Sequence, residues 1–150
     1  MAVDVAVETV IQRPVAEVAS YAGDPGNAPS WYVNIDSVER RTPGPVALES
    51  RMDFVATFLG RRIAYTYEVT ELVPGERLVM QTAEGPFPMR TTYVWEPAGA
   101  GTRMTLRNTG EPSGFSRLAG PLVQIAMRRA MTKDLAALKR ILEGAGPTPP

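Results

Sequence analysis

Hydrophobic residues recur every three or four positions along only one long stretch of the chain, residues 113–143. At about 100° per residue, the apolar side chains of its second part share one arc of a helix. These side chains are Met127, Met131, Leu135, Leu138 and Leu142. The opposite arc is basic and carries Arg128, Arg129, Lys133, Lys139 and Arg140. The pattern predicts a long amphipathic C-terminal helix, with a bend near Gly120-Pro121 where the apolar phase changes.

Shorter segments upstream alternate between apolar and polar residues, the period of strands with one buried face. The first is Val3–Ile11, and a second at 33–41 changes parity in a way that a β-bulge explains. Two short helices are predicted between them, one opening at Pro14 and one capped by Asp24. Five further strands follow between residues 52 and 109 as an antiparallel meander.

The turn at Gly60-Arg61 sets the predicted register of the hairpin in the middle of this meander. Glycine at the first central position of a two-residue loop favours a type II′ turn, which pairs Phe58 with Ile63. The same counting through the next hairpin places Val69 opposite Met80. The inner face that results is apolar and free of charge, whereas the other face carries most of the polar residues.

This order of elements predicts an α+β helix-grip architecture, a curved seven-stranded antiparallel sheet wrapped around the C-terminal helix. The two short helices lie between the first and second strands. One helix about 10 Å across does not fill such a sheet, so we expect a cavity beneath it. Residues 1–144 are predicted to form a single domain, followed by a disordered proline-rich tail at 145–150.

Composition narrows the function classes. Sixteen basic and sixteen acidic residues give the 150-residue chain no net charge, which argues against nucleic acid as a partner. There is no cysteine and no histidine, so we predict no cofactor, no metal site and no thiolate or imidazole catalyst. No apolar run reaches the roughly 20 residues of a membrane span, and the N-terminus lacks a signal-peptide pattern. We expect a cytoplasmic protein without stable membrane insertion, and an exposed sheet edge that permits a homodimer.

The side chains expected to line the cavity are mostly aromatic, methionine and neutral polar residues. They are Trp31, Phe54, Phe58, Tyr65, Tyr67, Met80, Thr82, Thr91, Tyr93, Trp95, Met104, Asn108, Gln124, Met127 and Met131. Two interpretations stay open: a ligand pocket with a few placed hydrogen-bonding groups, or an ordinary core whose tyrosines reach water or backbone. Asp134 lies at the border of the apolar arc, where a carboxylate either caps the pocket or is solvated.

Four segments, in this order and spacing, resemble the SRPBCC superfamily, which includes START domains and polyketide cyclase/dehydrase-like proteins. They read IQRPVAEVASYAGDPGNAPSW, FLGRRIAYTYEVTELVPGERL, YVWEPAGAGTRMTL and MRRAMTKDLAALKRILE. The resemblance implies the helix-grip fold and a central cavity for apolar or amphipathic small molecules. It also implies one of several roles, because some members are cyclases or aromatases, some carry lipids and others assist partner proteins.

Together these observations predict binding of a hydrophobic or aromatic small molecule, lipid-like or polyketide-like, in the cavity. One alternative is a polyketide cyclase, aromatase or dehydratase that acts in the same cavity without metal or histidine. A second alternative is a modulator that meets a partner protein through the basic helix face. No catalytic residue is identified from the sequence, because no charged side chain is expected on the inner face.

Overall fold

The computed structural model describes residues 3–111 and 120–144, and the elements alternate much as the hydrophobic pattern predicts. The strands are β1 (Val3–Ile11), β2 (Ile35–Arg40), β3 (Arg51–Phe58), β4 (Arg61–Val73), β5 (Arg77–Glu84), β6 (Met89–Ala98) and β7 (Gly101–Gly110). The helices are α1 (Val15–Ala22), η1 (Pro25–Asn27), α2 (Ala28–Trp31) and α3 (Gly120–Gly144). The predicted bend at Gly120-Pro121 falls at the first two residues of α3. The apolar segment before it lies outside the described residues, as does the tail.

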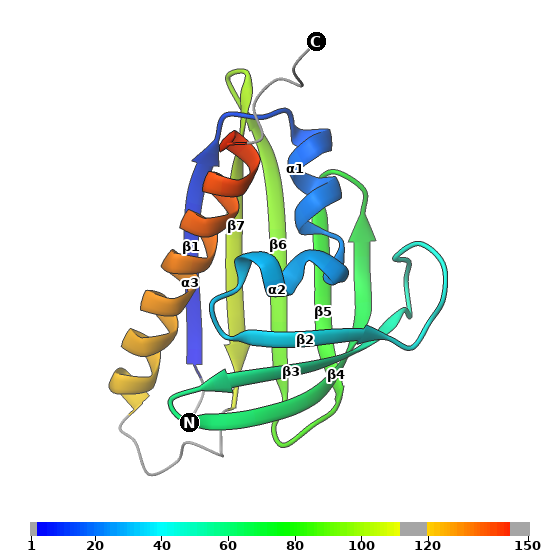
Figure 1. Ribbon diagram of the computed structural model, residues 1–150, viewed down its shortest axis with the longest axis vertical. Coiled ribbons are helices and arrows are strands. Elements are labelled where there is room, and N and C mark those ends of the chain that lie inside the picture. Colours follow the sequence, from blue (N-terminus) through cyan, green and yellow to red (C-terminus); the bar gives the residue numbers. More distant parts are fainter. Residues whose placement is uncertain (1–2, 112–119, 145–150) are drawn as a thin grey trace.

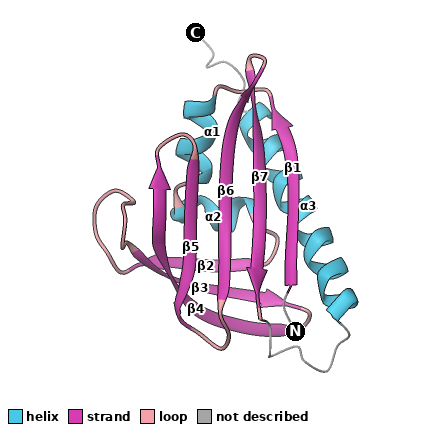
Figure 2. Cartoon of the chain, turned by 180° about the vertical axis from the view of Figure 1, so that it is seen from behind, coloured by secondary structure: helices cyan, strands magenta, loops and turns pink. Residues whose placement is uncertain are grey.

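All strands belong to one antiparallel sheet with the order β1-β7-β6-β5-β4-β3-β2. The sheet curls, so that β2, β3 and β4 cross below α1 and α2 while β1, β7, β6 and β5 stand behind the helices (Figure 1). Seen from behind, these four strands cover α1, α2 and much of α3 (Figure 2). The helix-grip architecture predicted from the sequence is therefore confirmed.

The local signals around the short helices also agree with the structure. The Asp24 side chain accepts a hydrogen bond from the Gly26 backbone N–H at 2.9 Å, as expected of a helix cap. In β2, the register with β3 shifts between Ile35 and Ser37, which confirms the predicted bulge. The strand itself begins at Ile35, two residues later than residue 33.

The predicted turn between β3 and β4 is wrong. Phe58 pairs with Arg61, and Ile63 pairs with Ala56. The loop residues are Leu59 and Gly60, whose φ angles are 51° and 77°; positive φ at both positions is typical of type I′. The register error is two residues, and because strand side chains alternate with a period of two, every side chain keeps its predicted face. In the next hairpin, the predicted pairing of Val69 with Met80 is confirmed.

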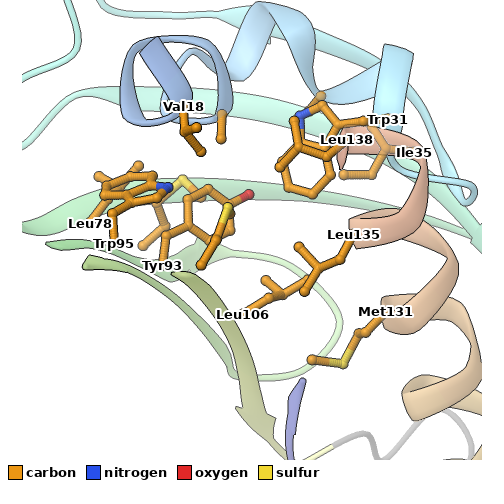
Figure 3. Close-up of a cluster of buried hydrophobic side chains, with 14 of the residues drawn as sticks. Val18, Trp31, Ile35, Leu78, Tyr93, Trp95, Leu106, Met131, Leu135 and Leu138 are labelled. Atoms are coloured by element: carbon orange, nitrogen blue, oxygen red, sulfur yellow. The ribbon is translucent and has the colours of Figure 1, made fainter. Parts of the chain in front are cut away.

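The C-terminal part of α3 forms the core between the sheet and the short helices. Leu135 and Leu138 are 2% and 0% exposed, and Val18 of α1 is likewise fully buried. Figure 3 shows Leu135 and Met131 of α3 pointing toward the sheet, where Leu106 lies on β7. These buried leucines pack the helix against the sheet.

Polar side chains of α3 cover the free edge of β1. The Gln124 Oε1 atom accepts from the Asp4 backbone N–H at 3.1 Å, and Arg128 donates to the Ala6 carbonyl at 3.0 Å. Lys139 donates to the Val10 carbonyl. These contacts pair backbone groups that an edge strand leaves unpaired, and they occupy part of the basic arc. Among the described residues, no helix is long and apolar enough to span a membrane.

Candidate functional site

A cavity of about 140 Å³ lies between the concave face of the sheet and the first half of α3. Most of the predicted cavity residues line it: Phe54, Phe58, Tyr65, Tyr67, Met80, Thr91, Tyr93, Asn108, Met127 and Met131. They come from β3 to β7 and from α3, so the sheet curvature brings together side chains far apart in the sequence. The arrangement agrees with the inner face predicted from strand alternation.

The other predicted residues lie near the cavity without lining it. Trp31 and Trp95 are 1% and 4% exposed, and both indole N–H groups are buried without a hydrogen-bond partner among the described residues. Met104 is fully buried in the core. The Thr82 hydroxyl is bonded to the backbone of Met89, and Gln124 is turned to the β1 edge described above. The alternation of side chains along a strand predicts which of them are buried. It does not predict which buried side chains line the cavity.

One end of the cavity is mainly apolar. Val3, Ile63, Phe87 and Val123 form a second buried cluster there, and Phe58 and Met127 pack against it. Of the cluster, Ile63 was expected on the inner face, whereas Val3, Phe87 and Val123 were missed. Phe87 lies between two prolines, in a segment without strand or helix periodicity, so no pattern marked it.

The opposite end carries a charged group whose position the sequence left open. Asp134 is 3% exposed and lines the cavity, which agrees with the first of the two outcomes expected for it, a carboxylate that caps the pocket. The described sheet residues that line the cavity carry no charge. One of its carboxylate oxygens accepts a hydrogen bond from the Val33 backbone N–H at 2.8 Å. Burial raises the pKa of Asp134 from 3.8 to about 7, although the hydrogen bond from Val33 partly opposes this change.

Two tyrosines lie beside this carboxyl group. The hydroxyls of Tyr32, which follows α2, and Tyr93 of β6 are hydrogen-bonded at 2.6 Å. Burial raises the pKa of both hydroxyls, and the negative charge of Asp134 adds to the effect. Both therefore remain protonated near neutral pH. One proton is used between them, so the pair has a second O–H left to donate. Tyr32 lines the cavity and was not among the residues predicted to do so.

A second polar group in the cavity is a chain of three side chains. The Tyr67 hydroxyl lies 2.8 Å from the Thr91 hydroxyl, which donates to the Asn108 carbonyl oxygen at 2.6 Å. A threonine hydroxyl has one proton, and this proton is given to Asn108, so Tyr67 must donate to Thr91. The Tyr67 oxygen then offers only lone pairs to the cavity. Burial raises the pKa of Tyr67 to about 12, so this chain is neutral.

The curled sheet, the long helix and the cavity between them define a helix-grip protein. The family described as polyketide cyclase/dehydrase and lipid transport matches residues 2–143, and the chain belongs to this family. A search of curated protein sequences gives no significant match.

Solved structures place the fold among similar proteins. A protein from Thermus thermophilus is 26% identical, with a TM-score of 0.80 over 97% of this chain and 100% of that one. An aromatase/cyclase, Zhui, from a Streptomyces species (strain R1128) is 14% identical, with a TM-score of 0.79 over 99% and 98%. A START superfamily protein from Mycobacterium smegmatis is 16% identical, with a TM-score of 0.77 over 95% and 97%. At these last two identities the likeness shows the fold alone.

Proposed function

We propose that this protein binds a hydrophobic or aromatic small molecule in the cavity between the sheet and α3. The observation that carries the proposal is the cavity itself: about 140 Å³, apolar at one end, with two separate polar groups elsewhere. Ligand sites combine apolar walls with a few hydrogen-bonding groups in this way. Membership of a family described by cyclase, dehydrase and lipid-transport members supports the same role.

A matched pair of alanines on α3 tests this proposal. Ala130 lines the cavity, whereas Ala136 is exposed on the same helix. N-phenyl-1-naphthylamine, a neutral fluorescent probe, is expected to bind the wild-type protein. Ala130→Phe fills the space and weakens binding by at least about tenfold, whereas Ala136→Phe changes it by less than about twofold. Equal affinity in the two variants would place the probe elsewhere and contradict the proposal. Native mass spectrometry of protein purified from its own host would then identify the natural ligand.

A second candidate function, a cyclase or dehydratase, is favoured by one observation: a carboxyl group with a pKa of about 7 lies in the cavity beside tyrosine hydroxyls. Such a group serves as general base at neutral pH. In this reaction the Asp134 carboxylate takes a proton from a carbon between two carbonyls. The resulting enolate oxygen accepts the free tyrosine O–H of the Tyr32–Tyr93 pair. The enolate carbon then attacks another carbonyl of the same chain, forming a C–C bond, and the new alkoxide recovers the proton from Asp134.

If the protein is an enzyme of this kind, removing the Asp134 carboxylate should abolish turnover without weakening the binding of a neutral ligand. With a linear poly-β-ketone thioester as substrate, product absorbance is expected to grow faster as the pH rises through about 7, where Asp134 ionises. Asp134→Asn removes the base, so turnover falls by at least about a hundredfold while the naphthylamine probe still binds. Undiminished turnover in Asp134→Asn excludes the mechanism and leaves the binding function unaffected.

A further inference from the structure

Asp134 differs from every other group that lines the cavity. Among the described lining residues it is the only one whose side chain ionises near neutral pH, and none of them is a lysine or an arginine. At 3% exposure, its ionised form is held away from water without a counter-charge. A buried charge without a partner is costly, so its retention in a cavity points to a partner that arrives with the ligand.

The contacts of this carboxyl group leave one side of it available. One oxygen is bonded to the Val33 N–H, and no other hydrogen bond to Asp134 is found within residues 3–111 and 120–144. The Tyr32 and Tyr93 hydroxyls are bonded to each other. The second carboxylate oxygen therefore retains its capacity to accept a hydrogen bond from a molecule in the cavity.

The distance along α3 to the apolar end sets the shape of this molecule. Asp134 lies eleven residues after Val123 of the apolar cluster, which is about 16 Å at about 1.5 Å per residue. A ligand with its polar group at Asp134 places its remaining atoms along Met131 and Met127, toward Phe58 and Val123. One polar head on a rigid or extended apolar body fits this layout.

Resting on the proposed binding function, we propose that the cavity selects ligands by charge. It takes an apolar molecule with a cationic amine at Asp134 and rejects one with a carboxylate there. A protonated amine supplies both the missing counter-charge and N–H donors, and such charge-assisted hydrogen bonds are stronger than neutral ones. An anion meets like charge in a poorly screened site and finds no cation among the described lining residues.

Three probes that share one apolar body test the selection. They are 2-naphthylmethylamine, 2-naphthylmethanol and 2-naphthoate, measured by titration calorimetry at pH 8. We expect the wild-type protein to bind the amine at least about tenfold more tightly than the alcohol, and the alcohol at least about tenfold more tightly than the carboxylate. Asp134→Asn is expected to bring all three within about threefold. Glu96→Gln removes an exposed carboxylate of β6 and keeps the wild-type order.

The pH dependence provides a second measurement that needs no variant. The groups that face Asp134 are Tyr32 and Tyr93, with Tyr65 next to them, and all remain neutral at pH 6 to 8 because burial raises their pKa. Lys133 on α3 is exposed. Protonation of Asp134 is then the change that matters, and the affinity for the amine falls at least about fivefold from pH 8 to pH 6. The affinity for the alcohol does not fall.

The possible outcomes separate this inference from the function on which it rests. If the probes bind equally well, or keep their order in Asp134→Asn, charge selection is wrong and binding by the cavity stands. If none of the three binds the wild-type protein and the neutral naphthylamine probe also fails, the binding function is wrong as well. A tighter amine complex that weakens in Asp134→Asn and at pH 6 supports the proposal.

Discussion

The two halves of α3 present the same kind of apolar arc to the sheet but meet different surroundings. In the core half, residues 135–142, the side chains of Leu135, Leu138 and Leu142 are buried in the hydrophobic core. In the cavity half, residues 123–134, Met127, Ala130 and Asp134 border empty space. A single amphipathic helix therefore packs into the core with one half and lines the cavity with the other. We expect substitutions in the cavity half to have less effect on the free energy of unfolding.

The largest expected effect compares one apolar side chain from each half. Leu138 is fully buried, so Leu138→Ala leaves a void in the core, and we expect a loss of about 3.5 kcal/mol in the free energy of unfolding. Met127 is only half-buried beside the cavity, so Met127→Ala is expected to cost less than about 1.5 kcal/mol. Urea unfolding followed by circular dichroism measures both. Similar losses would show that the two halves contribute equally to the core.

Asp134 marks the boundary between the halves, and its pKa gives stability a pH dependence. The folded pKa of about 7 lies above the ordinary value of 3.8, so between these values only the folded protein holds the proton. Stability is therefore highest at the acidic side of this window and is lost as the pH rises through 7. The expected loss from pH 5 to pH 8 is about 2.5 kcal/mol.

Asp134→Asn separates this effect from those of other carboxyl groups. The pKa values of Asp4, Asp53 and Glu143 are lowered mainly by hydrogen bonds, so these groups act below about pH 4 and not within the window. In the variant, urea midpoints at pH 5 and pH 8 are expected to agree closely. A variant that keeps the wild-type slope would assign it to another group.

Local sequence patterns predicted nearly all of the fold. Strand alternation, the Asp24 cap and the apolar stripe of α3 each depend on neighbours close in the chain. The turn between β3 and β4 is the exception, because Leu59 adopts a positive φ that its side chain disfavours and that only the whole hairpin imposes. The predicted register was shifted by two residues. Because strand side chains alternate with a period of two, the residues on the inner face stayed the same.

The site was predictable only where burial follows from alternation. Tyr67 and Thr91 were placed on the inner face by the strand period alone. For Asp134 the sequence left two outcomes open, because a place on the helix border is typical both of a pocket cap and of a solvated carboxylate. In the structure the side chain is buried, and it accepts a hydrogen bond from the Val33 backbone N–H, 101 residues earlier in the chain. Such a contact depends on how the α2–β2 connection meets α3, and no periodicity within either segment encodes it.

The smallest expected effect concerns a feature that the two halves share. Each half donates a side-chain hydrogen bond to a backbone carbonyl of β1. Arg128 in the cavity half donates to the Ala6 carbonyl, and Lys139 in the core half donates to the Val10 carbonyl. Each bond joins a partly exposed cation to a backbone group that water otherwise solvates, so Arg128→Met and Lys139→Met should each cost about 0.5–1 kcal/mol. Lys133→Met, on an exposed position of the same helix, is expected to change the unfolding free energy by less than about 0.3 kcal/mol.

Urea unfolding measures the free energy of unfolding of Arg128→Met and Lys139→Met. If the two variants lose equal amounts, the two halves of α3 differ only in the side chains that face the inside of the sheet. A markedly larger loss for Lys139→Met would mean that the two halves also differ in how strongly they bind the β1 edge. The reason would be the ion pair between Lys139 and Glu143, at 2.7 Å. Lys139→Met together with Glu143→Gln distinguishes these cases. If the ion pair matters, the double variant costs less than the sum of the two single changes. If only the carbonyl contacts matter, the two costs add, and the edge is held by independent bonds along the whole helix.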